Sequence, residues 1–239
     1  MRGPQPVLLN PLQMNQPDLE TRSLKLLTEI HAELRDALNG LGGRTYEGAR
    51  EAYRFHTAAH LNHAVEGYIY LRQGRRLDAS KHLVRNAIEM LILLMAVQKK
   101  PELLFRIALN EHNDKKTQVR CMAHGDVSAA LSAIDKQWSD FKSAYQTKYP
   151  EQQLVETQLS LRDIAQHAGI QSYYDTHYRL YCRFTHAALE ATIGSLNEFD
   201  GEDNRTMACC ALSGVEALSS IGAPTPNLES LRERLKNLT

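Results

Sequence analysis

Apolar residues recur every three or four positions along most of this 239-residue chain, and this spacing decides the fold class. A period of 3.6 residues places such residues on one face of an α-helix, whereas a half-buried strand alternates with a period of two. The sequence contains no alternating run bounded by hairpin turns. We therefore predict an all-α protein, a single multi-helix bundle of about eight to nine helices with no sheet.

Glycine and proline divide this pattern into helices and domains, because these residues end or interrupt helices. The predicted helices span residues 18–39, 45–73, 78–100, 101–123, 126–149, 159–168, 170–196, 204–221 and 228–238. Residues 1–17 contain four of the eight prolines and are predicted to form a flexible N-terminal arm. We predict the bundle domain at residues 18–222. Residues 223–239 then form a C-terminal helix, appended after a proline-containing linker.

Composition excludes several classes of function. Lys+Arg and Asp+Glu both number 28, so the chain is neither a strongly basic nucleic-acid coat nor a polybasic membrane anchor. The longest apolar run, residues 90–97, is far shorter than the roughly 20 residues that span a bilayer. The four cysteines show no disulfide pattern and suit a reducing cytosol. We expect a soluble, cytoplasmic protein that has no membrane partner.

Charged residues interrupt the most apolar of the predicted helices, residues 78–100. Arg85 and Glu89 lie one turn apart, so Arg85 can neutralise a Glu89 carboxylate that the helix buries. Two interpretations stay open: a structural ion pair near the end of the bundle, or a polar pocket whose charge serves binding or chemistry. Buried charges are seldom the best source of stability, which favours a functional role without deciding it.

A second polar set lies on the predicted helix 170–196. Its members follow one another at four-residue spacing on one face: Tyr174, Tyr178, Cys182 and His186. A stripe of tyrosines is either a hydrogen-bonded core face or the wall of a site. His186 adds a group that exchanges protons near neutral pH. We expect this face to pack against Arg85 and Glu89 and to form one polar pocket inside the bundle.

Three histidines on the predicted helix 45–73 raise the question of a metal site. His56, His60 and His63 share one helix face, at a spacing that metal ligands can have. A trio on one helix cannot reach a single ion without a ligand from elsewhere, so we interpret these histidines as solvated or packed side chains. We expect no metal and no cofactor.

Two segments of the sequence carry a family resemblance. They are ASKHLVRNAIEMLILLMAV, followed by PELLFR, and LRDIAQHAGIQSYYDTHYRLYCRFTHAAL. Both resemble signatures of the bacterial all-helical domain-of-unknown-function family 5677. That family carries Arg-x-x-x-Glu on an apolar helix and Tyr-x-x-x-Tyr-x-x-x-Ser-x-x-x-His on a later one. Cys182 stands at the serine position here, and the resemblance covers roughly residues 50–195.

This family is in turn similar to HEPN-type helical domains, which occur in bacterial toxin and phage-defence systems. HEPN ribonucleases use an Arg-x(4–6)-His motif on a late helix, usually at a dimer interface. Arg179 and His186 fit that spacing, and Arg183 is a further cation. The resemblance implies a metal-independent ribonuclease or toxin, in which His186 relays protons and one of these arginines, or Arg85, stabilises the phosphorane.

Our prediction is a non-catalytic helical module that binds a partner or ligand in a bacterial cytoplasmic system, such as stress response or phage defence. The residues predicted to line its polar pocket are Arg85, Glu89, Tyr174, Tyr178 and Cys182. The alternative is the ribonuclease, whose catalytic residues would be His186, Arg179 and Arg183. We expect a homodimer, from the neutral net charge and the HEPN similarity, and a protein or an RNA as the partner.

Overall fold

The structure is a computed structural model that describes residues 16–74, 77–122, 125–185 and 200–238. Every regular element in these ranges is a helix, so the predicted all-α fold is confirmed. The elements are α1 (Gln16–Gly40), α2 (Ala49–Gln73), α3 (Leu77–Lys99), α4 (Leu103–Met122), α5 (Ser128–Lys148), α6 (Leu161–His167), α7 (Gln171–Tyr173), η2 (Tyr174–Tyr178), α8 (Arg179–Thr185), α10 (Asp200–Ser219) and α11 (Leu228–Lys236). With the continuous α7, η2 and α8 taken as one helix, the described ranges contain nine.

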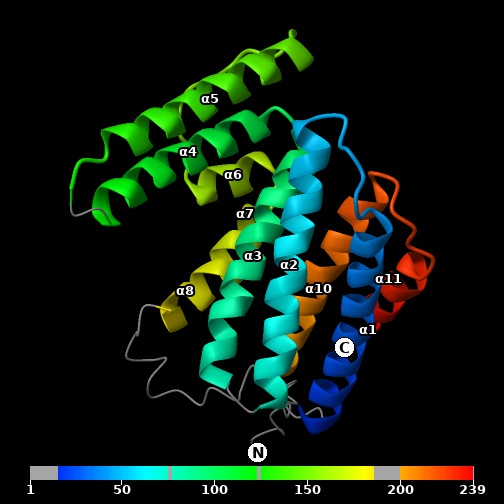
Figure 1. Ribbon diagram of the computed structural model, residues 1–239. Coiled ribbons are helices and arrows are strands. Elements are labelled where there is room, and N and C mark those ends of the chain that lie inside the picture. The colour runs from blue at the N-terminus through cyan, green and yellow to red at the C-terminus, as the bar shows by residue number, and fades with distance from the viewer. Residues whose placement is uncertain (1–15, 75–76, 123–124, 186–199, 239) are drawn as a thin grey trace, which may run out of the picture.

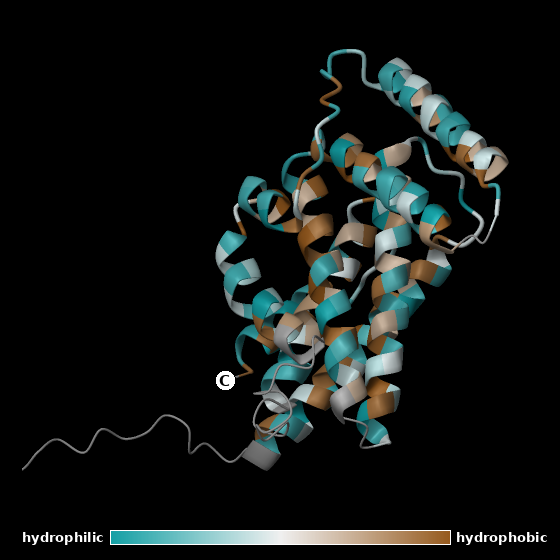
Figure 2. Cartoon of the chain, turned by 90° about the vertical axis from the view of Figure 1, so that its left-hand side faces the viewer, coloured by the Kyte–Doolittle hydropathy of each residue, from teal (hydrophilic) through white to brown (hydrophobic). Residues whose placement is uncertain are grey.

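Four long helices, α1, α2, α3 and α10, pack together as the core of the bundle (Figure 1). Their inner faces carry fully buried aliphatic side chains, such as Leu34 on α1, Leu61 on α2 and Ile92 on α3. Figure 2 shows hydrophobic faces turned towards the interior and hydrophilic faces turned outwards. α3 contacts α2, α4, α6, α8 and α10, so the helix predicted to be the most apolar is the central one. None of the described helices has both the length and the apolar character needed to cross a membrane.

The helices α4 and α5 form a hairpin that lies across one end of the bundle (Figure 1). Aromatic rings join them: Phe105 of α4 lies 5.1 Å from Trp138 and 5.6 Å from Tyr145 of α5, measured between ring centroids. At the end of α5, the Arg50 guanidinium of α2 lies 4.1 Å from the centre of the Tyr149 ring. α5 therefore packs chiefly on α4 and meets the bundle at its C-terminal end.

Local sequence signals explain several helix boundaries. The Ser160 hydroxyl accepts a hydrogen bond from the Asp163 backbone NH at 3.2 Å, and the Asp163 carboxylate accepts one from the Ser160 NH at 3.1 Å. This reciprocal capping box starts α6. Gly169 ends that helix with φ of +68°, a left-handed conformation that side chains disfavour. The helix predicted to start at Asp18 begins two residues earlier, because Pro17 is tolerated in the first turn.

The C-terminal segment is attached to the bundle through α11, which packs on α1 and α10. Leu228, Leu231 and Leu235 of α11 are buried. Glu33 of α1 is also buried and accepts hydrogen bonds from the Asn227 backbone NH at 3.2 Å and from its side-chain amide at 2.8 Å. Apolar burial and the hydrogen bonds between Glu33 and Asn227 thus hold the predicted C-terminal helix. Of the predicted N-terminal arm, residues 1–15 lie outside the described residues.

Candidate functional site

One face of α3 carries three charged residues at four-residue spacing, and this face is directed towards α8 and α10. We define the polar junction as the side chains that meet there: Lys81, Arg85 and Glu89 from α3, Tyr178, Tyr181 and Cys182 from η2 and α8, and Asp203 from α10. The spacing places the α3 residues one above another on the helix. The polar junction therefore joins three helices along about two turns of α3.

Arg85 is held mainly by Tyr178. Its Nη2 donates a hydrogen bond to the Tyr178 hydroxyl at 3.0 Å, and its guanidinium lies 5.4 Å from the centre of that ring. The Tyr178 hydroxyl donates to Glu89 Oε2 at 3.4 Å, while Arg85 Nη2 lies 3.9 Å from the same oxygen. The predicted packing of Arg85 and Glu89 against Tyr178 is thereby confirmed.

This part of the polar junction is half-exposed. The Arg85 side chain is 29% exposed and that of Glu89 is 41% exposed, whereas Tyr178 is buried. The prediction of a buried pocket is therefore wrong for Arg85 and Glu89. The physical reason is that α8 covers this flank of α3 incompletely, so water reaches both charges and a ligand can reach them too.

Hydrogen bonding keeps Arg85 charged, whereas burial keeps Tyr178 neutral. Burial alone would lower the pKa of Arg85, but hydrogen bonds with Cys182 and Tyr178 outweigh burial and raise that pKa above its ordinary value. Burial and the Glu89 carboxylate raise the pKa of Tyr178 to about 12. Arg85 Nε is buried and has no hydrogen-bond acceptor within the described part of the chain. Arg85 is thus a permanent cation whose hydrogen-bond partner Tyr178 is neutral.

One turn before Arg85, the polar junction becomes fully buried. Lys81 Nζ pairs with Asp203 Oδ2, and these side chains are 1% and 0% exposed. The Tyr181 hydroxyl donates a hydrogen bond to Asp203 Oδ1, and Lys81 Nζ lies 6.0 Å from the centre of the Tyr181 ring. Burial and the Asp203 carboxylate raise the pKa of Tyr181, so its hydroxyl keeps its proton and acts as a donor. A buried ion pair therefore connects α3 to α10, and Tyr181 adds α8 to it.

Hydrogen bonds continue from α10 to the other two core helices. The Tyr68 hydroxyl donates to Asn204 Oδ1 at 2.8 Å. Asn204 Nδ2 donates to the Glu20 carbonyl oxygen and to Ser23 Oγ, both at 3.2 Å. Arg72, whose side chain is 2% exposed, pairs with the Glu20 carboxylate at 2.7 Å. The interior of this end of the bundle is consequently polar across all four core helices.

A single π-helical turn, η2, ends at Tyr178, which faces Arg85 of α3. Such a turn holds one residue more than an α-helical turn and is often found at functional sites. The rings of Tyr174 and Tyr178 stack across it, with centroids 5.1 Å apart and planes inclined by 22°. The regular helix predicted over these residues is therefore wrong at this turn. Residues four positions apart share a face in both helix types, so the four-residue spacing from Tyr174 onwards could not reveal the π-helical turn.

The predicted catalytic residues lie only in part within the described ranges. The Arg179 side chain is 69% exposed, and its Nη1 lies 4.0 Å from Asp175 Oδ1. The backbone of Arg183 belongs to α8, but its side chain is outside the described part of the structure, and so is all of His186. Cys182 is half-buried and contacts Arg85.

The three histidines of α2 are exposed, as the interpretation of solvated side chains requires. His63 Nδ1 lies 4.0 Å from the Glu66 carboxylate, and the His56 ring lies edge-on to Phe55, 5.6 Å between centroids. Within the described ranges, no three His, Cys, Asp or Glu side chains come together closely enough to hold a metal ion.

Within the polar junction, Lys81, Tyr181 and Asp203 were not predicted as site residues, and neither was Asn204, which continues the network from α10. Lys81 had a usable signal, because it precedes Arg85 by the same four residues that separate Arg85 from Glu89. Asp203 and Asn204 had none, since short polar residues at a helix start ordinarily act as caps. The predicted helix began at Asn204, whereas α10 begins at Asp200 and so places both residues inside the helix.

The polar junction lies within the region that a family comparison recognises. The family of unknown function DUF5677 matches residues 52–203, which is more than half of the chain. The chain belongs to this family. In this DUF5677 protein the matched region begins in α2 and ends at Asp203, so it includes every residue of the polar junction. No curated protein and no solved structure matches the chain.

Proposed function

We propose that this DUF5677 protein is a binding module whose polar junction holds an anionic group of its ligand through Arg85. The observation that carries the proposal is that Arg85 is fixed by the neutral Tyr178, through a 3.0 Å hydrogen bond and a ring contact of 5.4 Å. Its carboxylate neighbour, Glu89, is at 3.9 Å. A cation that a neutral hydrogen-bond partner already holds in place loses little freedom when it binds an anion.

The other buried cations of this network are paired differently. Arg72 lies 2.7 Å from the Glu20 carboxylate, and Lys81 pairs with Asp203 in the core. Both have the environment of structural charges, which are buried and neutralised at short range. Arg85 differs in both respects, because its side chain is 29% exposed and its carboxylate neighbour, Glu89, is as far away as 3.9 Å. This contrast supports a ligand-binding role for Arg85 rather than a structural one.

Phosphate, as in an RNA backbone, is the anionic group that we propose first. A guanidinium has a planar set of donors that can form two parallel hydrogen bonds with phosphate oxygens. The Tyr178 hydroxyl lies beside the guanidinium and can add a third hydrogen bond. RNA is also one of the two partner classes expected from the sequence.

Fluorescence anisotropy with a short labelled single-stranded RNA tests this proposal. Arg85→Gln is expected to raise the Kd by about tenfold or more, and Tyr178→Phe is expected to have a smaller effect. Arg120→Gln, at an exposed arginine of α4, is the matched control because it removes one positive charge from a helix that contributes no residue to the polar junction. The absence of RNA binding by the folded protein, or equal losses in Arg85→Gln and Arg120→Gln, would overturn the proposal.

A metal-independent ribonuclease is the second candidate, and one contact favours it. Arg85 contacts Cys182, which precedes His186 by four residues in the sequence. In this scheme His186 relays the proton during attack by the 2′-hydroxyl, and Arg85, or Arg179 with Arg183, stabilises the developing phosphorane charge. Cleavage of transfer RNA in EDTA that disappears in both His186→Ala and Arg85→Ala, with circular dichroism unchanged, would establish it. Binding without cleavage would leave the binding module.

We also propose that the protein is a cytoplasmic homodimer of a bacterial stress or phage-defence system. This proposal is supported by the HEPN similarity and by the zero net charge. Light scattering is expected to give about twice the chain mass of 27.0 kDa, and a mass of 27.0 kDa at micromolar concentration would contradict a stable dimer.

A further inference from the structure

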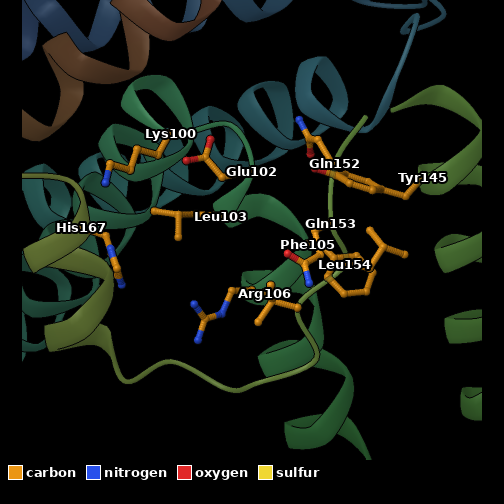
Figure 3. A pocket seen from close by; sticks show the side chains of 11 residues that line it. Lys100, Glu102, Leu103, Phe105, Arg106, Tyr145, Gln152, Gln153, Leu154 and His167 are labelled. Carbon is orange, nitrogen blue, oxygen red and sulfur yellow. Dashed lines mark hydrogen bonds between the residues drawn. The ribbon is translucent and has the colours of Figure 1, made fainter. Parts of the chain in front are cut away.

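A second concave site lies away from the polar junction, where the α4–α5 hairpin meets the rest of the chain. A cavity of about 240 Å³ is bordered by the start of α4, the end of α5, the connection that follows α5 and the end of α6 (Figure 3). Pockets for organic ligands usually measure about 300–1,000 Å³, so this cavity lies below that range. It suits a small molecule of about one ring with one substituent.

Positive charge borders one side of the cavity. Figure 3 shows the Lys100 and Arg106 side chains on either side of Leu103. Glu102 is the one carboxylate among the eleven side chains that line the cavity. Neither Lys100 nor Arg106 forms an ion pair within the described ranges. An ammonium and a guanidinium that lack carboxylate partners provide an attractive environment for an anion.

The other side of the cavity is apolar and aromatic. Phe105 and Leu154 line it together with Tyr145 (Figure 3). The Tyr145 hydroxyl donates a hydrogen bond to Gln152 Oε1 at 2.8 Å, so the tyrosine contributes mainly its ring to the cavity. Flat apolar groups pack well against such aromatic surfaces.

The wall of the cavity is fixed by hydrogen bonds within the chain. Arg106 Nε donates to the Thr157 carbonyl oxygen at 2.9 Å. Asn110 Nδ2 donates to the Leu159 carbonyl oxygen at 2.5 Å, and Asn110 Oδ1 accepts from the Leu159 NH at 3.3 Å. These bonds attach the connection after α5 to α4 and orient the Arg106 guanidinium. When the side chains of a site are already ordered, less binding free energy is lost in ordering them.

We propose that this cavity binds a small organic anion that combines a phosphate or carboxylate group with one flat apolar ring. Lys100 and Arg106 hold the anionic group, and the ring packs on Phe105 and Leu154. The site shares no residue with the polar junction, so it stands independently of the function proposed there.

Tryptophan fluorescence provides the assay. Trp138 is the single tryptophan of the chain, and its ring centroid lies 5.1 Å from that of Phe105. Two probes, phenyl phosphate and benzoate, combine the two features of the proposed ligand, an anionic group and an aromatic ring. Inorganic phosphate has only the anionic group, and benzyl alcohol has only the ring. At least one of the two-feature probes is expected to bind with a Kd of about 1 mM or below, and both single-feature probes more weakly. The ratio of phenyl phosphate to benzoate affinity identifies the preferred anion.

Variants connect any signal to the cavity. Lys100→Gln and Arg106→Gln are each expected to weaken binding of the better probe by about tenfold. Lys100→Gln is the decisive one, since Arg106 also holds the wall of the cavity. Arg120→Gln on the same helix and Arg85→Gln at the polar junction are expected to leave the Kd unchanged. No binding of either two-feature probe, equal binding of benzyl alcohol, or equal weakening in Arg120→Gln would overturn the proposal.

Discussion

Substitutions at the buried Lys81–Asp203 ion pair test how the polar junction contributes to stability. Asp203→Asn keeps the shape of the side chain and an oxygen that can accept from the Tyr181 hydroxyl, but it removes the carboxylate from Lys81. Lys81→Met removes the ammonium and leaves the carboxylate. The double substitution removes both charges and retains the acceptor for Tyr181.

The expected magnitudes follow from burial. Because the two side chains are 1% and 0% exposed, each single substitution leaves a buried charge without this partner, which costs about 3–5 kcal/mol of unfolding free energy. Domains of ordinary stability have about 5–15 kcal/mol in total. In urea, where the slope is roughly 1–3 kcal/mol per molar, the midpoint would fall by roughly 1–5 M. The double variant is expected to lose less than either single variant, because no unpaired charge remains.

Urea unfolding followed by far-ultraviolet circular dichroism measures these differences. Lys136→Met is the control: Lys136 pairs with Asp140 on the exposed face of α5, and its loss is expected to leave the midpoint unchanged. The reasoning would be refuted if Asp203→Asn cost less than about 1 kcal/mol, or if the double variant lost the sum of the two single losses.

Three further predictions concern the rest of the bundle. Ile92→Asp puts a carboxylate at a fully buried position of α3 and is expected to abolish soluble expression; a soluble, helical variant would contradict the central place of α3. Leu231→Ala in α11 is expected to lower the free energy of unfolding by about 2–4 kcal/mol, and urea unfolding with a loss below about 1 kcal/mol would count against a docked α11. Burial lowers the pKa of His31 and His177 below the ordinary 6.5. The stability that these neutral side chains contribute above pH 6.5 is therefore lost as the pH falls through their pKa values in the folded state. The urea midpoint should therefore decrease as the pH is lowered from about 7 to about 5, and it should decrease less in His31→Gln. Burial raises the pKa of Glu111, so this residue contributes to the pH dependence with the opposite sign. Identical pH profiles for wild type and His31→Gln would show that His31 contributes nothing.

The spacing of apolar residues was sufficient to predict the helices, because each helix buries one face and this face appears in the sequence as a repeat of three or four residues. The apolar run at residues 90–97 can be satisfied only by a helix with neighbours on several sides, and α3 has them. Gly169 marked the end of α6 because a left-handed residue follows that helix. The positions of α1 and α2 relative to α10 were not predictable, since a helix face indicates that it packs but not against which partner.

Within the polar junction, too, some contacts could be predicted from the sequence and others could not. Arg85 and Tyr178 each stood out as members of a spaced set, so their contact could be anticipated from two helix faces and a family resemblance. Lys81 and Asp203 are separated by 122 positions in the sequence, and neither one indicates the other. Such a pair is defined by the packing of the helices, which the pattern of a single sequence does not contain.

The π-helical turn η2 also sets the register of α8. Its extra residue places each residue that follows one position further back than a continuous α-helix would, a rotation of about 100°. In a continuous α-helix, His177 would occupy the place opposite Arg85 that the phenol of Tyr178 occupies now. The one extra residue therefore puts a neutral phenol, rather than an imidazole, beside the guanidinium.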